Sequence, residues 1–138
     1  CFYILETISR SIQDGWTPLI SISRITPKFL KNEIKNIVKN KPHYFYDNSG
    51  ENPYYAFLGV SNIALVTPDS VNMVSETITA NLSTYIFDLK CRSKRINKFL
   101  RTCEEDNFIK NNNGKINKFH FEKSNSTKEI ADHLAKLI

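Results

Sequence analysis

The sequence predicts an α/β fold with a doubly wound, mainly parallel sheet. Short apolar runs with the length of strands alternate along the chain with longer segments whose apolar residues recur every three or four positions. The connections between these segments are short, and such alternation is typical of βαβ units with right-handed crossovers. A length of 138 residues suits one domain. We therefore expect a single α/β domain over residues 1–138.

The first part of the chain predicts two helices separated by a strand. Apolar residues at helical spacing predict a helix over 2–13, and the run at 18–23 has the length of a strand. Pro27 suits the first turn of a second helix, with Thr26 as its N-cap. The buried stripe of this second helix is predicted to be Leu30, Ile34, Ile37 and Val38.

The remaining elements continue the alternation. In order, we expect a strand at 43–46, a turn at 47–50, a helix at 53–60, a strand at 63–66, a helix at 69–80, a strand at 84–87, a basic helix at 93–105, a loop at 111–114 and a helix at 126–138. The strand at 63–66 is apolar on both faces, which is typical of a sheet covered by helices on both sides. This pattern predicts a Rossmann-like domain.

The basic composition is weak evidence for a nucleic-acid partner. The formal charge is +5, but Ile, Asn and Lys together make up 45 of the 138 residues, and all three have AT-rich codons. A biased genome would raise lysine throughout the chain, and scattered lysine attracts polyanions only weakly. We therefore expect no specific nucleic-acid partner.

The cysteines and the start of the chain suggest a piece of a larger cytoplasmic protein. Three cysteines without CxxC spacing predict neither a disulfide framework nor a metal site, and no apolar run reaches the ~20 residues of a membrane span. The chain begins at Cys1 rather than methionine. We expect 1–13 to be a leading or interdomain helix, and an N-terminal partner domain to lie outside this chain.

The strongest candidate for ligand binding is the segment from Val66 to Glu76, where a buried strand leads directly into a helix rich in hydroxyl side chains. Free amides and the helix dipole at such a start attract anions. Ser70 could donate to a phosphate oxygen, and Glu76 could accept hydrogen bonds from a ribose diol. Alternatively, Thr67, Asp69 or Ser70 only caps the helix and Glu76 faces water.

Two basic segments are further candidates for anion contacts. Arg24 follows the first predicted strand, where its guanidinium could hold a phosphate or could simply cover the edge of the sheet. The stretch 90–101 contains three of the five arginines, and Arg92, Lys94 and Arg95 lie at its start. It could contact a diphosphate, an acidic acceptor or anionic lipid headgroups, or it could be a solvated helix face.

Three blocks of the sequence resemble the mitochondrial-fission ELM ("elongated mitochondria") family, which is similar to GT-B glycosyltransferases. They are the Ser-Arg-Ile-Thr-Pro turn at 23–27, Asn52-Pro53-Tyr54 together with 66–76, and the basic helix from Ser93 to Leu100. Two positions depart from the family pattern. Ile25 stands where the family has a second arginine, and Asn81-Leu82 stands where a Gly-Lys-Pro type of turn is usual.

The resemblance implies the C-terminal half of a GT-B-type protein that binds a nucleotide-sugar without a metal. The diphosphate and ribose would be held by Arg24, Thr67, Ser70, Ser75 and Glu76. The resemblance also implies an alternative, a non-catalytic interaction or scaffold protein that kept the fold. Catalytic residues are not assigned in either case. The protein is expected in the cytoplasm, or at a membrane surface through the basic stretch 90–101.

Overall fold

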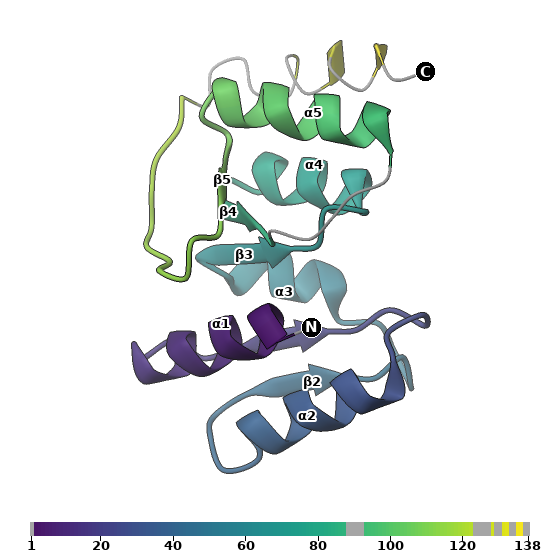
Figure 1. Ribbon diagram of the computed structural model, residues 1–138, viewed down its shortest axis with the longest axis vertical. Coiled ribbons are helices and arrows are strands. Elements are labelled where there is room, and N and C mark those ends of the chain that lie inside the picture. Colours follow the sequence, from purple (N-terminus) through teal and green to yellow (C-terminus); the bar gives the residue numbers. More distant parts are fainter. Residues whose placement is uncertain (1, 88–92, 123–127, 129–130, 133–134, 137–138) are drawn as a thin grey trace. The chain divides into compact units, whose positions relative to one another are not determined.

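The computed structural model describes residues 2–87, 93–122, 128, 131–132 and 135–136. The chain forms two compact units, Cys1–Val60 (unit 1) and Ser61–Ile138 (unit 2), and each is described here by itself. Within each unit, parallel strands alternate with helices (Figure 1), which confirms the predicted α/β class. The strands form a two-stranded sheet in unit 1 and a three-stranded sheet in unit 2. The arrangement is consistent with a Rossmann-like domain, and a single domain over 1–138 stays a prediction.

Unit 1 contains two short parallel strands and three helices. In chain order these are α1 (Phe2–Gln13), β1 (Leu19–Ser21), α2 (Lys28–Val38), β2 (Tyr44–Tyr46) and α3 (Tyr54–Val60). Leu19 lies opposite Tyr44 in the register of β1 and β2. The core joins Ile8 of α1 to three residues of the predicted α2 stripe, Leu30, Ile34 and Val38. Unit 1 is therefore held together mainly by two amphipathic helices that share one buried cluster.

The start of α2 differs from the prediction. Its N-cap is Pro27, and the hydroxyl of Thr26 instead accepts a hydrogen bond from the N–H of Ser23 at 3.1 Å. The N–H of Thr26 in turn donates to the carbonyl of Ser23 at 3.1 Å. Thr26 is therefore wrong as the N-cap, because its side chain closes the turn after β1 one residue before the helix boundary.

Unit 2 has a parallel sheet with β4 in the centre. Its elements are β3 (Ile63–Val66), α4 (Val71–Thr79), β4 (Ser83–Ile86), α5 (Lys94–Glu105) and β5 (Ile109–Asn111), and the strand order is β3-β4-β5. The third strand is a correction, because the sequence predicted only a loop at 111–114. β5 forms because Ile109 is buried and pairs with Thr84 of β4.

The turn between α4 and β4 shows how Asn81 fits where the family has glycine. Asn81 has a φ of 62°, the left-handed conformation that glycine adopts most easily. Its N–H donates to the carbonyl of Ile78 at 2.9 Å, and the N–H of Leu82 donates to the carbonyl of Thr77 at 3.0 Å. These two bonds form a Schellman motif, so the substitution keeps a standard helix end.

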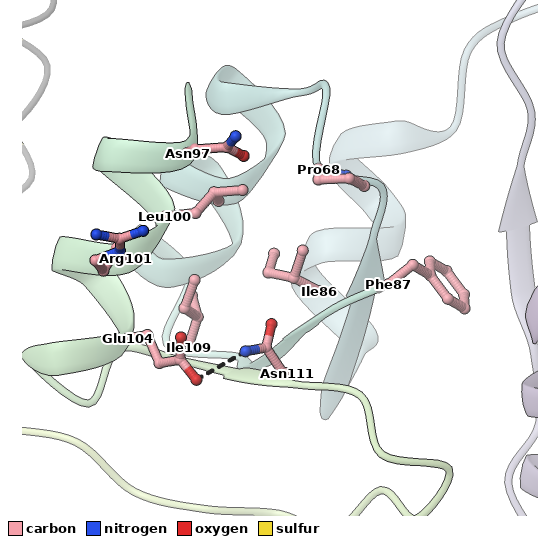
Figure 2. A pocket seen from close by; sticks show the side chains of 9 residues that line it. All are labelled: Pro68, Ile86, Phe87, Asn97, Leu100, Arg101, Glu104, Ile109 and Asn111. Atoms are coloured by element: carbon pink, nitrogen blue, oxygen red, sulfur yellow. Dashed lines mark hydrogen bonds between the residues drawn. The ribbon is translucent and has the colours of Figure 1, made fainter. Parts of the chain in front are cut away.

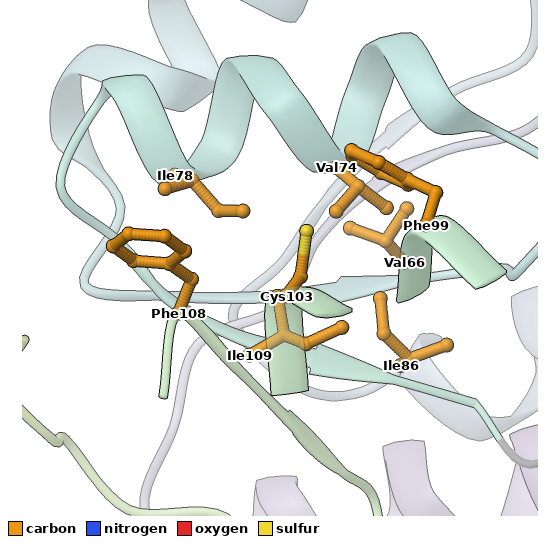
Figure 3. Close-up of a cluster of buried hydrophobic side chains, with 8 residues drawn as sticks. All are labelled: Val66, Val74, Ile78, Ile86, Phe99, Cys103, Phe108 and Ile109. Atoms are coloured by element: carbon orange, nitrogen blue, oxygen red, sulfur yellow. The ribbon is translucent and has the colours of Figure 1, made fainter. Parts of the chain in front are cut away.

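Helices α4 and α5 share one buried cluster on a single face of the unit 2 sheet (Figure 3). The cluster consists of Val66, Val74, Ile78, Ile86, Phe99, Cys103, Phe108 and Ile109. Burial, followed by the nearby charge of Asp106, raises the pKa of the Cys103 thiol to about 12. Cys103 is therefore a protonated core residue at neutral pH and not a reactive thiolate.

Side chains on the opposite face of β4 form hydrogen bonds with the main chain of an extended segment, residues 117–119. Side chains alternate along a strand, so Ser83 and Tyr85 point away from Thr84 and Ile86. The Ser83 hydroxyl accepts from the N–H of Phe119 at 2.8 Å and donates to the carbonyl of the same residue at 3.0 Å. The Tyr85 hydroxyl donates to the carbonyl of Asn117 at 2.9 Å and accepts from its N–H at 3.1 Å. Among the described residues of unit 2, an extended segment therefore contacts this face of β4.

Most of the predicted helix at 126–138 lies outside the described residues. Residues 128, 131, 132 and 135 have helical backbone, and the N–H of Lys136 donates to the carbonyl of Asp132 at 3.2 Å. These residues agree with a helix in this part of the chain.

Candidate functional site

The start of α4 lies at the carboxyl end of β3, at the edge where α/β sheets bind ligands. The chain turns over Thr67–Ser70, and the N–H of Ser70 donates to the carbonyl of Thr67 at 3.3 Å. Thr67 and Ser70 are half-buried, and Asp69 is exposed. Ser70 is the N-cap residue, but its side chain makes no capping hydrogen bond. The turn is thus partly exposed, with Pro68 buried in it, and the Ser70 hydroxyl is not used to cap the helix.

Ser75 and Glu76 lie farther along α4. The Ser75 hydroxyl donates to the carbonyl of Val71 at 3.0 Å, and the residue is buried. Glu76 is half-buried in the middle of the helix. A ligand contact by either residue stays a prediction, and the use of the Ser75 hydroxyl within α4 makes Ser75 the weaker of the two.

A hollow of about 250 Å³ opens at the same edge of the unit 2 sheet (Figure 2). Its lining comes from the turn after β3, the end of β4, one face of α5 and β5. The lining residues are Pro68, Ile86, Phe87, Asn97, Leu100, Arg101, Glu104, Ile109 and Asn111. The floor is apolar and buried, whereas the four polar side chains, Asn97, Arg101, Glu104 and Asn111, are exposed.

Two of the four polar residues of the hollow are hydrogen-bonded to each other. The side-chain amide of Asn111 donates to the Glu104 carboxylate at 2.8 Å, as the dashed line in Figure 2 shows. Figure 2 also shows Phe87 pointing away from the other lining side chains. The polar side chains therefore provide most of the accessible lining, above a buried aliphatic floor.

Most of these polar residues were not identified from the sequence. Asn97, Arg101 and Glu104 are spaced four and three residues apart, so they form one stripe of α5. The sequence pattern marks Arg101 as part of the basic run and Glu104 as part of the acidic group that follows it, but it assigns neither to a site. The stripe was visible in the sequence, but Asn111 was not, because its position depends on the unpredicted strand β5.

Two of the three predicted anion contacts of the basic helix lie at the start of α5. The Ser93 hydroxyl caps the helix by accepting from the N–H of Ile96 at 3.3 Å. Lys94 and Arg95 follow it and are exposed. Arg92 lies outside the described residues. Lys94 and Arg95 can therefore meet an anion from solution, and this contact stays a prediction.

Arg24 belongs to unit 1, where it is exposed in the turn after β1. Ile25 beside it is 81% exposed. Because Arg24 and the start of α4 lie in different units, the prediction that they share one ligand stays a prediction. The structure places Arg24 in the turn that follows β1, three residues after the end of that strand.

Two further properties limit the kinds of site among the described residues. No three side chains of His, Cys, Asp or Glu gather there in a way that could hold a metal ion. No helix in that part of the chain has both the length and the apolar character needed to cross a bilayer.

Comparison with known proteins agrees with the resemblance seen in the sequence. Neither the curated proteins nor the solved structures include a match to this chain. A family model described as "Mitochondrial fission ELM1" matches residues 3–138, which is nearly the whole chain. The chain therefore belongs to the mitochondrial fission ELM1 family.

Proposed function

We propose that unit 2 binds a nucleoside diphosphate at the start of α4, with a nucleotide-sugar as the natural ligand. The observation that carries this proposal is the partly exposed Thr67–Ser70 turn at the carboxyl end of β3. Ligands of open α/β sheets bind at this edge. The GT-B-like character implied by the family resemblance supports the same location.

The first amides of α4 are the proposed diphosphate contacts. The N–H groups of the first three helical residues, Val71 to Met73, have no carbonyl acceptor within the helix. The fourth, that of Val74, donates to the carbonyl of Ser70 at 3.1 Å. Together with the helix dipole, the first amides favour an anion by up to about 1 kcal/mol at an exposed site. The Ser70 hydroxyl adds a donor at the same place.

The charges around this turn act in both directions. Asp69 is exposed at the start of α4, where its carboxylate competes with a phosphate for the same amides. Lys94 and Arg95 in the same unit offset this charge through longer-range attraction. Removing the Asp69 charge should therefore strengthen binding, which is the opposite of what a structural role for Asp69 as a cap would predict.

Calorimetric titration of the protein with UDP and GDP tests the proposal. Ser70→Ala should weaken binding about fivefold and Glu76→Gln about tenfold, because each removes a hydrogen bond to a charged or polyhydroxyl group. Asp69→Asn should strengthen binding about threefold. Glu105→Gln is the matched control, since Glu105 is exposed at the far end of α5. The proposal fails if neither diphosphate binds at millimolar concentration, or if Ser70→Ala and Glu76→Gln match the control.

A second candidate is a non-catalytic interaction protein, which the exposed apolar residues of unit 1 favour. Ile25, in the turn before α2, is 81% exposed, and Phe29, in the first turn of α2, is 58% exposed. Exposed apolar groups of this kind often mark interaction sites. A stoichiometric partner lost in Ile25→Ser and Phe29→Ser but kept in Glu76→Gln would favour this candidate. A partner insensitive to the two apolar substitutions would argue against it.

A further inference from the structure

We infer that the hollow between α5 and the carboxyl ends of β3, β4 and β5 binds the sugar ring of the nucleotide-sugar. This inference rests on the proposed diphosphate site at α4, and it assigns a separate group of residues to a separate part of the ligand. The two places are adjacent along the chain. Pro68 lines the hollow, and Ser70, two residues later, is the N-cap of α4.

The size of the hollow fits one ring and not a whole nucleotide-sugar. A volume of about 250 Å³ is below the ~300–1,000 Å³ of pockets that enclose a drug-sized ligand. The diphosphate would stay at the open start of α4, and only the group attached to it would enter the hollow.

The charges of the hollow favour an uncharged ligand. Arg101 is the cationic side chain of the lining and Glu104 the anionic one, so their formal charges cancel. A phosphate would find no net attraction there, unlike at the start of α4. The two carboxamides, Asn97 and Asn111, each offer both donors and an acceptor. Hydroxyl groups, which also donate and accept, are the complementary chemistry.

The inner surface favours a sugar over a nucleobase. Nucleobases gain much of their binding free energy by stacking on aromatic side chains. Phe87, the aromatic residue of the lining, points away from the other lining side chains in Figure 2. The floor is instead formed by Pro68, Ile86 and Ile109, which are buried and aliphatic. These residues expose little surface, so most of the accessible lining is polar and suits the hydroxyl groups of a sugar.

Asn111 is the most informative residue of this site. Its amide already donates to the Glu104 carboxylate at 2.8 Å, which fixes the orientation of both groups. The side-chain carbonyl oxygen of Asn111 and the second carboxylate oxygen of Glu104 can then accept hydrogen bonds from neighbouring hydroxyl groups of one sugar ring. Loss of Asn111 would release Glu104 as well, so its effect should exceed that of Asn97.

The experiment compares each nucleotide-sugar with its own diphosphate. UDP, GDP, UDP-glucose, UDP-N-acetylglucosamine and GDP-mannose are titrated into the protein and into Asn97→Ala, Asn111→Ala and Asn113→Ala. Asn113 is the matched control because it is exposed, lies in unit 2 and is not part of the lining. At least one sugar should bind about tenfold more tightly than its diphosphate. That preference should fall to about threefold in Asn97→Ala, vanish in Asn111→Ala and persist in the control.

The outcomes separate this inference from the proposed function. If no diphosphate binds, the proposed function and the inference both fail. If the diphosphates bind but none of the three sugars adds affinity, the diphosphate site stands and the sugar site is overturned. A sugar preference that survives in Asn111→Ala also overturns it. Amide NMR spectra provide a second readout, in which sugar-specific shifts must include the side-chain amides of Asn97 and Asn111.

Discussion

The two units share one plan of parallel strands and amphipathic helices, yet their described residues form buried hydrophobic clusters of different size. Four residues form the buried cluster of unit 1, and eight form that of unit 2. Among the described residues, the large apolar side chains that stay exposed all lie in unit 1: Phe2, Ile25, Phe29, Tyr44, Tyr55 and Val60. A sheet of two three-residue strands gives little surface to pack against. Unit 2 should therefore be the more stable, and unit 1 the better surface for interaction.

The largest expected effect on the free energy of unfolding comes from replacing a buried isoleucine, and one such residue is available in each unit. Ile78→Ala should cost about 3–5 kcal/mol and Ile34→Ala about 2–3 kcal/mol, because Ile78 leaves a cavity in the larger cluster. Ile25→Ala is the control and should change stability by less than about 0.5 kcal/mol. Urea denaturation measures the three values. Equal losses at Ile34 and Ile78 would break the comparison between the units.

Hydrogen exchange on the same variants sharpens the comparison. If each unit opens by itself, Ile34→Ala should speed exchange in β1 and β2 but leave β3 to β5 unchanged, and Ile78→Ala should do the reverse. If either substitution speeds exchange equally in both sheets, the units unfold together and the contrast concerns packing alone.

A smaller effect is expected at the extended segment of unit 2. Tyr85→Phe removes the hydroxyl that both donates to and accepts from Asn117, and it should cost about 1–3 kcal/mol because Tyr85 is buried. Tyr55→Phe is the matched control, since Tyr55 is 75% exposed. Denaturation measures both, and exchange of the Asn117 amide should rise only in Tyr85→Phe. A loss no larger than that of Tyr55→Phe would show that the segment does not depend on this anchor.

The smallest effect is expected in the turn after β2. The hydroxyl of Ser49 donates to Asp47 at 2.5 Å, and this bond is the main cause that holds the pKa of Asp47 below its usual value. Because the folded-state pKa is lowered, the stability from ionised Asp47 is present above the unfolded pKa of about 3.9 and is lost as the pH falls through the folded value. NMR titration should show that Ser49→Ala raises the Asp47 pKa. An unchanged pKa would assign the shift to the backbone N–H of Ser49 and to Lys31 and Lys35 instead.

The sequence predicted those elements whose own residues carry the pattern. The apolar strand at 63–66 and the stripe of Leu30, Ile34 and Val38 needed no information from elsewhere in the chain. β5 was missed because a run of Ile109-Lys110-Asn111 has only one apolar residue, and its strand conformation comes from pairing with β4. Local pattern is informative where burial is periodic, and fails where a partner strand decides the conformation.

The candidate site was predictable to the same extent. The strand-to-helix turn at Thr67–Ser70 is local in sequence, and the structure places it at the carboxyl edge of the sheet, as predicted. The hollow combines residues from four separate segments, so spacing alone could not reveal it. The hydrogen bond between Asn111 and Glu104 in this hollow forms only because β5 pairs with β4, which brings Asn111 next to α5.

The hydrogen bonds between β4 side chains and the main chain of residues 117–119 determine which mutations this region tolerates. The Tyr85 hydroxyl bonds the main chain of Asn117 and makes no use of the asparagine side chain. Most substitutions at position 117 should therefore change the stability of the fold little. Proline is the exception, because it has no N–H to donate. The constraint falls on Tyr85 instead, thirty-two residues earlier in the chain.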